Sequence, residues 1–160
     1  MASHPTAATS ATPAIVLART PVRAAMQLGL YECDPDADLR TLARTMAERT
    51  IHAVVVPDVA NARGLRGRLA WGVVSDIELM RALRPGMEQT SAGEIAATEV
   101  VSVLPGDTLE HAAQLMADHD TAHLVVVSPD TGRPVGMLST LDVARFAAGA
   151  SEADNAPTNR

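Results

Sequence analysis

The stretch Gly136-Met137-Leu138-Ser139-Thr140-Leu141-Asp142-Val143 decides how this sequence is interpreted. It joins a short apolar run to Ser-x-x-Asp, and a serine followed three residues later by an acidic residue is typical of a helix start. A similar phrase, Gly72-Val73-Val74-Ser75-Asp76-Ile77-Glu78-Leu79, stands 64 residues earlier. Because the phrase occurs twice, we infer that the chain uses one supersecondary unit twice.

The duplication continues upstream of both phrases. Seven residues recur 70 positions later, and the six-residue difference between the two shifts is an insertion in the first copy. Two copies favour units that bury their apolar faces against each other, because an open solenoid needs about three repeats or more. The matched residues are Pro35, Leu39, Ala43, Met46, Ala47, Val55 and Val56, which recur as Pro105, Leu109, Ala113, Met116, Ala117, Val125 and Val126.

Each copy predicts the element order β-α-β-β-α. Apolar residues stand at helical spacing from Leu39 to Met46, and again from Leu109 to Met116. The continuous apolar runs that follow are too short for helices and predict buried strands. The expected strands are residues 30–32, 53–56 and 69–74 in the first copy, and 100–103, 123–127 and 134–138 in the second.

The starts of the predicted helices are marked by polar residues. Asp36 is the expected cap of the first long helix, and Asp107 is the expected cap of the second, with Glu110 completing a capping box. Short lead-in helices are expected before each copy, and a further helix is expected after each glycine phrase. These remaining helices are residues 24–27, 75–83, 93–97 and 139–147.

The paired units predict an α/β (α+β) fold, in which two β-α-β-β-α repeats pack with pseudo-two-fold symmetry. At 160 residues the chain has the size of one domain, so the two half-size units must share a core. The expected organisation is a disordered leader (residues 1–13), a first repeat (14–84), a linker (85–91), a second repeat (92–149) and a disordered tail (150–160).

Composition excludes several classes of function. The three aromatic residues are too few for stacking platforms on single-stranded nucleic acid, and a net charge of −6 disfavours a phosphate backbone as a partner. A single cysteine, Cys33, forms no intramolecular disulfide, which fits a reducing compartment. No apolar run reaches the roughly 18 residues of a membrane-spanning helix, and residues 1–13 lack the pattern of a signal peptide. We therefore expect a cytoplasmic protein that binds neither nucleic acid nor membrane.

Catalysis has little support in the sequence. It contains no phosphate-binding glycine loop, no Gly-x-Ser-x-Gly elbow and no zinc-ligand spacing. We predict that the protein is not an enzyme and requires no cofactor or metal. The histidines His52, His119 and His123 are interpreted as polar residues at strand ends, with phosphate contact as the functional alternative. A metal pair of His119 and His123 is disfavoured, because no third ligand accompanies them.

The repeat, with Gly-apolar-apolar-Ser-x-x-Asp at its last helix, resembles the CBS domain, and its duplication resembles a CBS pair (Bateman module). The resemblance covers about residues 20 to 148. It implies a regulatory protein that binds an adenosine-containing ligand, such as AMP, ADP, ATP or S-adenosylmethionine, between its repeats. It also implies a homodimer that associates through the helices of both repeats and passes its state to an unknown protein target.

The resemblance assigns two ligand sites. In the family, the motif serine and aspartate typically hold the ribose, while the first strand and the start of the second strand form an adenine slot. By position, the better site has Ser139, Thr140 and Asp142 for the ribose, and Val101, Ser102, Val103, His123 and Leu124 for the slot. The weaker site has Ser75 and Glu78, with Tyr31, Glu32, Cys33, Ala53 and Val54 as its slot, because Glu78 replaces the usual aspartate.

Both motifs also have a purely structural interpretation. Ser-x-x-Asp and Ser-x-x-Glu can cap helices without any ligand. The chain would then be an assembly module that dimerises and docks on another protein. The insertion in the first copy, with Arg63, Arg66 and Arg68, is interpreted as a mobile, solvated loop, with a phosphate or partner contact as the alternative.

Overall fold

The structure is a computed structural model that describes residues 12–59, 71–86 and 89–149. The loop from Arg63 to Arg68, most of the predicted leader and the predicted tail lie outside the described residues. The first repeat contains one long helix, a two-stranded hairpin and a final helix. These elements are α3 (Leu39–Arg49), β2 (Ala53–Pro57), β3 (Trp71–Ser75) and α5 (Asp76–Ala82).

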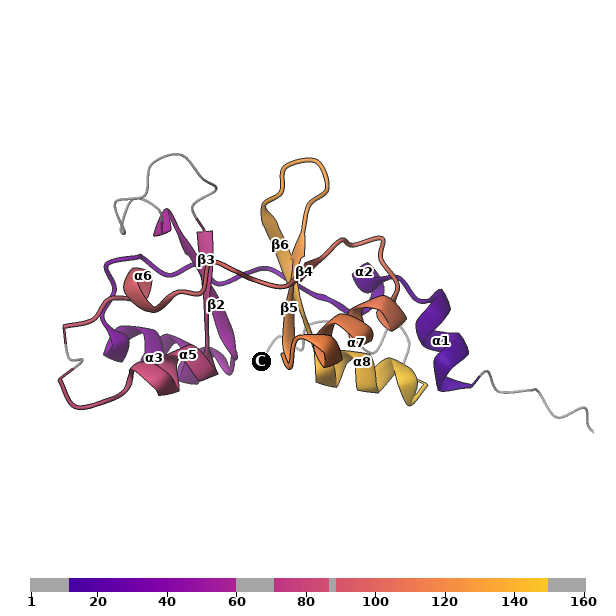
Figure 1. The fold of residues 1–160 in the computed structure, drawn as a ribbon, viewed down its shortest axis with the longest axis horizontal. Helices are drawn as coiled ribbons and strands as arrows, with labels where there is room; N and C mark the ends of the chain where they lie inside the picture. Colours follow the sequence, from indigo (N-terminus) through magenta and orange to yellow (C-terminus); the bar gives the residue numbers. More distant parts are fainter. Residues whose placement is uncertain (1–11, 60–70, 87–88, 150–160) are drawn as a thin grey trace, which may run out of the picture.

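The second repeat has the same order and adds a short first strand. Its elements are β4 (Ser102–Val103), α7 (Leu109–Asp118), β5 (His123–Val127), β6 (Pro134–Ser139) and α8 (Thr140–Ala147). The predicted α+β fold, the duplication and the central strands and helices of both repeats are thus confirmed. In Figure 1, the helices of both repeats lie along the same edge of the molecule, and the two hairpins stand side by side in its middle.

Four short elements lie outside these blocks: α1 (Pro13–Arg19), α2 (Val22–Ala25), β1 (Gln27–Leu28) and α6 (Ala92–Ile95). The helix α1 was not expected from the sequence. The predicted strand at residues 30–32 is wrong as placed, because β1 lies earlier and only Glu32 forms an isolated bridge, to Val55.

The sheets show the pseudo-symmetry of the sequence. One sheet has the order β1-β6-β5-β4, with β4 parallel to β5 and the other pairs antiparallel. The other sheet is the antiparallel pair β2-β3. Two isolated bridges extend this pair. Glu32 lies parallel to β2 at Val55, as β4 lies beside β5, and Ala97 lies antiparallel to β3 at Val73, as β1 lies beside β6. The strand-pairing register is therefore the same in both repeats, at the shifts of 64 and 70 residues found in the sequence.

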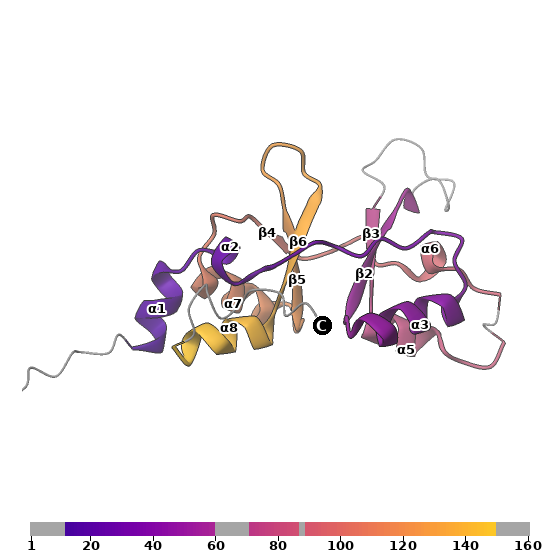
Figure 2. The same cartoon turned by 180° about the vertical axis from the view of Figure 1, so that it is seen from behind.

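The two repeats exchange their lead-in segments. The residues Val22 and Ala25 of α2 are buried in the core of the second repeat, whereas Ala92, at the start of α6, is buried in the core of the first. The Val22 N–H donates to the carbonyl of Asp107 at 2.7 Å, and the Ala92 N–H donates to the carbonyl of Ala37 at 2.8 Å. Figures 1 and 2 show the chain crossing between the halves after α2 and again after α6.

The glycine of each phrase is required by this exchange. A Cβ on Gly136 would lie 2.7 Å from the carbonyl oxygen of Gln27, and a Cβ on Gly72 would lie 2.8 Å from that of Ala97. Real Cβ atoms essentially never approach a backbone oxygen so closely. Glycine therefore lets an exchanged segment lie directly against the strand of the other repeat.

Both predicted caps of the long helices are wrong. The carboxylate of Asp38, not that of Asp36, caps α3 and accepts from the Thr41 N–H at 2.7 Å. Thr108 caps α7 by accepting from the His111 N–H at 3.2 Å. Asp107 instead accepts from the Leu104 N–H at 2.8 Å, so it closes the preceding turn, and Glu110 forms no capping box. In both helices the capping residue directly precedes the leucine that begins the apolar face of the helix, Leu39 in α3 and Leu109 in α7.

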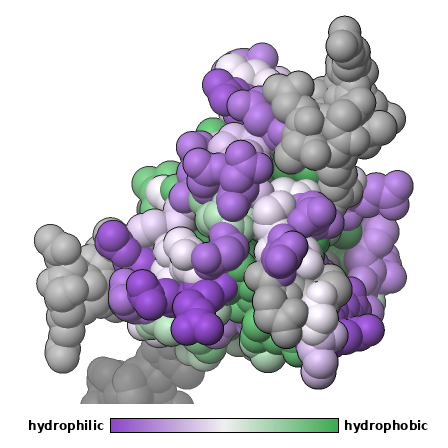
Figure 3. All heavy atoms as spheres, turned by 90° about the vertical axis from the view of Figure 1, so that its left-hand side faces the viewer, coloured by the Kyte–Doolittle hydropathy of each residue, from purple (hydrophilic) through white to green (hydrophobic). Residues whose placement is uncertain are grey.

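Three hydrophobic clusters organise the interior. One lies within each repeat, and the third joins the two repeats through Val55, Val73 and Val125. Partly buried Leu30 and Trp71 pack on this third cluster, which is the shared core expected for half-size units. Figure 3 looks onto the end of the molecule formed by the first repeat, where hydrophilic side chains are spread between smaller hydrophobic patches.

Candidate ligand site between the repeats

The predicted ribose residues Ser139 and Asp142 form the cap of α8. The Oδ2 atom of Asp142 accepts from the Ser139 backbone N–H at 2.9 Å and from the Ser139 hydroxyl at 2.6 Å. Its Oδ1 atom lies 3.5 Å from Nη1 of Arg145, and the Asp142 side chain is only 1% exposed. Both carboxylate oxygens of Asp142 already contact residues three positions away, Ser139 and Arg145. A ribose hydroxyl would have to replace one of these contacts.

The weaker motif forms the same cap with a longer side chain. The Oε2 atom of Glu78 accepts from the Ser75 backbone N–H at 3.0 Å and from the Ser75 hydroxyl. Its Oε1 atom lies 3.7 Å from Nη1 of Arg81, and the side chain is 23% exposed. The capping interpretation of both motifs is thus confirmed, and the ribose role of either carboxylate stays a prediction.

The residues of the predicted adenine slots do not gather around one opening. Val103 and Leu124 are buried in the core of the second repeat, and Cys33 and Val54 are buried in the core of the first. Their side chains are enclosed by apolar neighbours. The remaining slot residues are half-buried or exposed: Val101, Ala53 and His123 are half-buried, and Tyr31, Glu32, Ser102 and the neighbouring Thr140 are exposed.

Two residues of the weaker slot have their own local partners. The guanidinium of Arg49 lies 5.2 Å from the ring centroid of Tyr31, so one face of the ring is covered by a cation–π contact. Burial, together with the charge of Asp34, raises the pKa of the Cys33 thiol. A thiol in this state behaves as a small apolar side chain.

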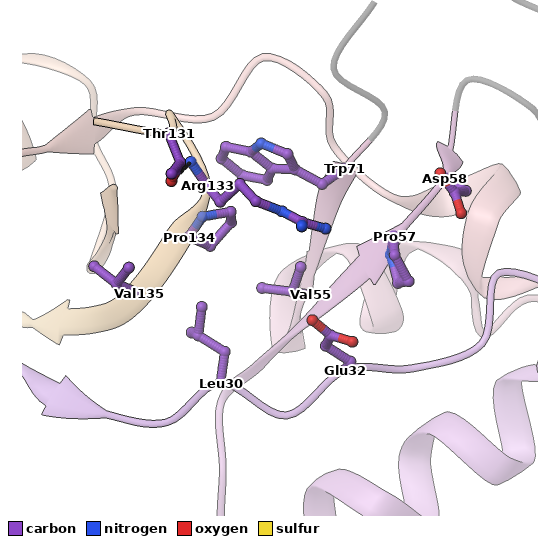
Figure 4. Close-up of a pocket in the computed structure, with 10 residues that line it drawn as sticks. All are labelled: Leu30, Glu32, Val55, Pro57, Asp58, Trp71, Thr131, Arg133, Pro134 and Val135. Atoms are coloured by element: carbon purple, nitrogen blue, oxygen red, sulfur yellow. Dashed lines mark hydrogen bonds between the residues drawn. The ribbon is translucent and has the colours of Figure 1, made fainter. Parts of the chain in front are cut away.

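A cavity of about 520 Å³ opens between the two repeats, beside the ends of the hairpins (Figure 4). This volume lies within the range of small-molecule sites, roughly 300–1,000 Å³. The first repeat and the segment before it form one wall, and the β5–β6 hairpin forms the other. The lining residues are Leu30, Glu32, Val55, Pro57, Asp58 and Trp71 on the first wall, and Thr131, Arg133, Pro134 and Val135 on the second.

Trp71 and Arg133 are two of the lining residues that the sequence analysis did not assign to a site. Trp71 begins β3 and turns its indole toward the cavity, and Arg133 precedes β6. Figure 4 shows the Arg133 side chain extending from the second repeat toward the wall that carries Val55 and Glu32. Trp71 is the only tryptophan in the sequence and stands at the start of a strand, which could have marked it as a candidate site residue. No local sequence pattern links it to Arg133. Glu32 is the one predicted slot residue that lines the cavity.

A histidine pair lies where β5 begins beside α5. The rings of His52 and His123 stack with their centroids 5.7 Å apart, and Nδ1 of His52 lies 3.3 Å from Oδ2 of Asp76. Desolvation lowers the pKa of His123, and His52 adds to this effect, while Asp76 and Asp142 oppose it. His123 also borders a more open hollow of about 560 Å³ formed with Asp76, Ile77, Met80, Arg81, Arg84 and Ala122. Within the described ranges, no group of three or more histidine, cysteine or acidic side chains could hold a metal ion.

A family model for the CBS domain matches residues 22–85 and 92–149. The two matches coincide with the two repeats of the fold, so the chain belongs to the CBS domain family and is a tandem CBS pair. In the part of the chain that the structure describes, no helix is long and apolar enough to cross a membrane.

The chain is similar to the CBS domain-containing protein YhcV of Bacillus subtilis (strain 168), with 28% identity over 138 residues, 86% of this chain and 93% of YhcV. It is also 34% identical over 74 residues to the uncharacterized protein MJ1404 of Methanocaldococcus jannaschii, which is 45% of this chain but only 17% of MJ1404. Its fold is shared with the CBS domain pair of protein MJ0100, solved in complex with 5′-methylthioadenosine and S-adenosyl-L-methionine. That comparison has a TM-score of 0.67 and 19% identity, and covers 81% of this chain and 97% of that chain.

Proposed function

We propose that the protein is a cytoplasmic regulatory module that binds an adenosine-containing ligand between its repeats and passes the change to a partner protein. The observation that carries this proposal is the cavity between the repeats, whose walls come from both. A ligand there contacts Trp71 of the first repeat and Arg133 of the second. Its binding therefore shifts the protein toward one arrangement of the two repeats. The size of the shift equals the difference in the ligand's binding free energy between the two arrangements.

An aromatic base suits the cavity. The indole of Trp71 offers a face for stacking, and Leu30, Val55 and Pro134 supply apolar walls. The MJ0100 pair, which shares this fold, was solved with two adenosine derivatives bound. The hydroxyls and carboxylates at Ser139 and Asp142 remain the predicted alternative position for the ribose.

A thermal-shift panel tests the proposal. AMP, ATP, S-adenosylmethionine, NAD and cyclic di-AMP are each added at millimolar concentration, because a ligand that binds only the folded state stabilises it by about 2.7 kcal/mol at 100 times its Kd. We expect at least one nucleoside ligand to raise the Tm. If none does, the sensor proposal fails and the assembly module replaces it.

Three variants then locate the ligand. Trp71→Ala removes the stacking face of the cavity, Asp142→Ala removes the predicted ribose acceptor, and Tyr31→Ala alters the weaker predicted slot. We expect Trp71→Ala to abolish most of the ligand-dependent shift and Tyr31→Ala to leave it unchanged. Loss of the shift only in Asp142→Ala would place the ligand in the predicted site and not in the cavity.

The second candidate is the assembly module, and exposed apolar residues on the final helices favour it. Ile77 and Met80 on α5 are 49% and 60% exposed, and Leu141 on α8 is 57% exposed. Exposed apolar patches usually mark interfaces. We propose that these helices form a homodimer interface, which is compatible with either function. A monomer mass by light scattering at micromolar concentration would exclude the dimer.

A further inference from the structure

We infer that two copies of this chain associate head to tail, with α5 of each copy packed on α8 of the other. This inference rests on the proposed homodimer and adds its orientation. It starts from the exposed faces of the two final helices, which stand at matched positions of the repeats and are nevertheless different. The matched positions, 64 residues apart, are Ile77, Met80 and Leu83 at α5 and Leu141, Ala144 and Ala147 at α8.

The two faces differ in the size of their apolar side chains. The first residue of each face is large in both helices. Met80 and Leu83 then follow at α5, and they are 60% and 51% exposed. The matched residues of α8 are Ala144, which is exposed, and Ala147, which is half-buried. The face of α5 therefore projects where the face of α8 is shallow.

Both faces lie along one edge of the molecule, with the junction between the repeats in the middle (Figures 1 and 2). Both helices begin at this junction. The Asp76 N–H donates to the carbonyl of His52, whose ring stacks on that of His123 at the start of β5. The Thr140 N–H donates to the carbonyl of Ala122, the residue before His123. From there, α5 and α8 extend toward opposite ends of the molecule.

A second copy can meet this edge in two closed arrangements. A two-fold axis through the junction places either α5 on α5 and α8 on α8, or each α5 on the α8 of the other copy. In the first arrangement the projecting residues Met80 and Leu83 oppose themselves, while the shallow faces at Ala144 oppose each other and leave a gap. In the second arrangement large residues lie over small ones at both contacts. Because interface cores pack as densely as protein interiors, the second arrangement is favoured.

The open hollow beside α5 supports a second copy as the molecule that covers this edge. Ile77 and Met80 belong both to the exposed face and to the hollow of about 560 Å³, which reaches Ala122 and His123 at the junction. A molecule that packs on the face of α5 therefore also closes this hollow. A second copy presents an edge of equal length, so it covers the junction and both helix faces at once and also removes Leu141 from water.

Cysteine cross-linking tests the orientation. Cys33 is the sole cysteine and is buried, so Cys33→Ala provides a background without native thiols, and light scattering checks that this background keeps the dimer mass. Met80→Cys and Ala144→Cys are introduced separately into it and treated with a short bis-maleimide, alone and after co-expression. We expect no covalent dimer from either variant alone. The co-expressed pair should give a covalent dimer that mass spectrometry assigns to positions 80 and 144.

A charge pair tests the same contact without a cross-linker. Met80→Lys and Ala144→Glu should each return a monomer mass by light scattering, because each places a charge against an apolar part of the other copy. Co-expression of the two variants should restore the dimer mass, since one α5–α8 contact then pairs opposite charges and the other is wild type. In the alternative arrangement each charge would face the wild-type form of its own helix, and the mixture would stay monomeric.

The outcomes separate the orientation from the dimer itself. Leu28→Cys is the matched control for cross-linking to Met80→Cys, since Leu28 is 78% exposed but lies in β1, outside both helix faces. A covalent dimer from Met80→Cys alone would overturn the head-to-tail inference, and so would a pair that cross-links no better than this control. A charge pair that stays monomeric, with both variants folded by circular dichroism, would also overturn it. A monomer mass for the wild-type protein would instead overturn the proposed homodimer.

Discussion

Ser139 donates both its backbone N–H and its hydroxyl to one carboxylate oxygen of Asp142, at 2.9 and 2.6 Å. The Asp142 N–H donates back to the Ser139 hydroxyl oxygen at 3.2 Å. This reciprocal cap is buried, which gives the carboxylate a structural role whatever it does for a ligand. The contribution of this family motif to the free energy of unfolding can therefore be measured without any ligand.

We expect Asp142→Ala to lower the free energy of unfolding by about 1–3 kcal/mol, because it removes a cap and leaves the Ser139 N–H without its partner. Glu78→Ala should cost about 0.5–1 kcal/mol, since its side chain is partly exposed and water can replace it. Urea unfolding of both variants measures the difference. Equal losses would mean that burial of the carboxylate does not decide the strength of the cap.

The ribose prediction for Asp142 adds a ligand-dependent expectation. If Asp142 holds the ribose, Asp142→Ala weakens binding at least tenfold, about 1.4 kcal/mol, beyond any effect on stability. Glu78→Ala should weaken it much less. Calorimetry with whichever nucleoside the panel identifies distinguishes the two roles, and an unchanged Kd in Asp142→Ala restricts this residue to the cap.

Gly136→Ala should destabilise the fold by roughly 1–3 kcal/mol, because the new methyl group would lie 2.7 Å from the carbonyl oxygen of Gln27 and would push β1 from β6. Gly106→Ala is the control, since a Cβ at Gly106 meets no atom within 4 Å, and it should change stability by less than about 0.5 kcal/mol. Thermal unfolding of the two variants in parallel gives the comparison. A Gly136→Ala variant as stable as Gly106→Ala would show that β1 moves away at no cost.

Met80→Lys should dissociate the proposed homodimer, because it places a charge in the middle of the exposed apolar surface of α5. Leu28→Lys is a suitable control, since Leu28 is 78% exposed and belongs to β1, outside the final helices. Light scattering at micromolar concentration should return a monomer mass for Met80→Lys and a dimer mass for Leu28→Lys. A dimer that survives Met80→Lys would use another surface.

His123 predicts the pH dependence of stability near neutrality. Its folded-state pKa is lowered from the ordinary value of 6.5, chiefly by desolvation, so the unfolded chain binds its proton more readily than the folded chain. The stability linked to this group is present above pH 6.5 and is lost as the pH falls through the folded-state pKa. Urea unfolding at pH 7.5 and 5.5 should show a smaller loss in His123→Gln than in the wild-type protein.

The parts of the fold that the sequence predicts are those encoded by local patterns. The stripe from Leu39 to Met46 and the run before Pro57 identify α3 and β2 because periodicity is set by neighbours in the chain. The caps were wrong by one or two residues for a different reason. Asp36, Asp38, Asp107 and Thr108 are all good capping residues, and only the position of the first helical leucine selects among them.

The exchange of lead-in segments was not predictable from such patterns. The apolar residues of α2 show that one of its faces is buried, but not which repeat buries it. The cavity was missed for the same reason, because Trp71 and Arg133 lie in different hairpins and meet only when the repeats pack. Family resemblance pointed to Ser139 and Asp142, whose polar atoms are occupied by the cap in this structure.

The pairing of Gln27 with Met137 has a consequence for how the chain acquires its fold during synthesis. A ribosome releases β1 long before β6 exists, so β1 lacks this hydrogen-bonding partner until β6 has been synthesised. The core of the second repeat also lacks Val22 if the early segment is lost. The second repeat therefore needs the early segment as well as its own residues, whereas the core of the first repeat ends at Ala96. A product that terminates before Met137 leaves the second repeat without its last strand pairing and final helix, and this unfinished half should be a substrate for cellular proteases.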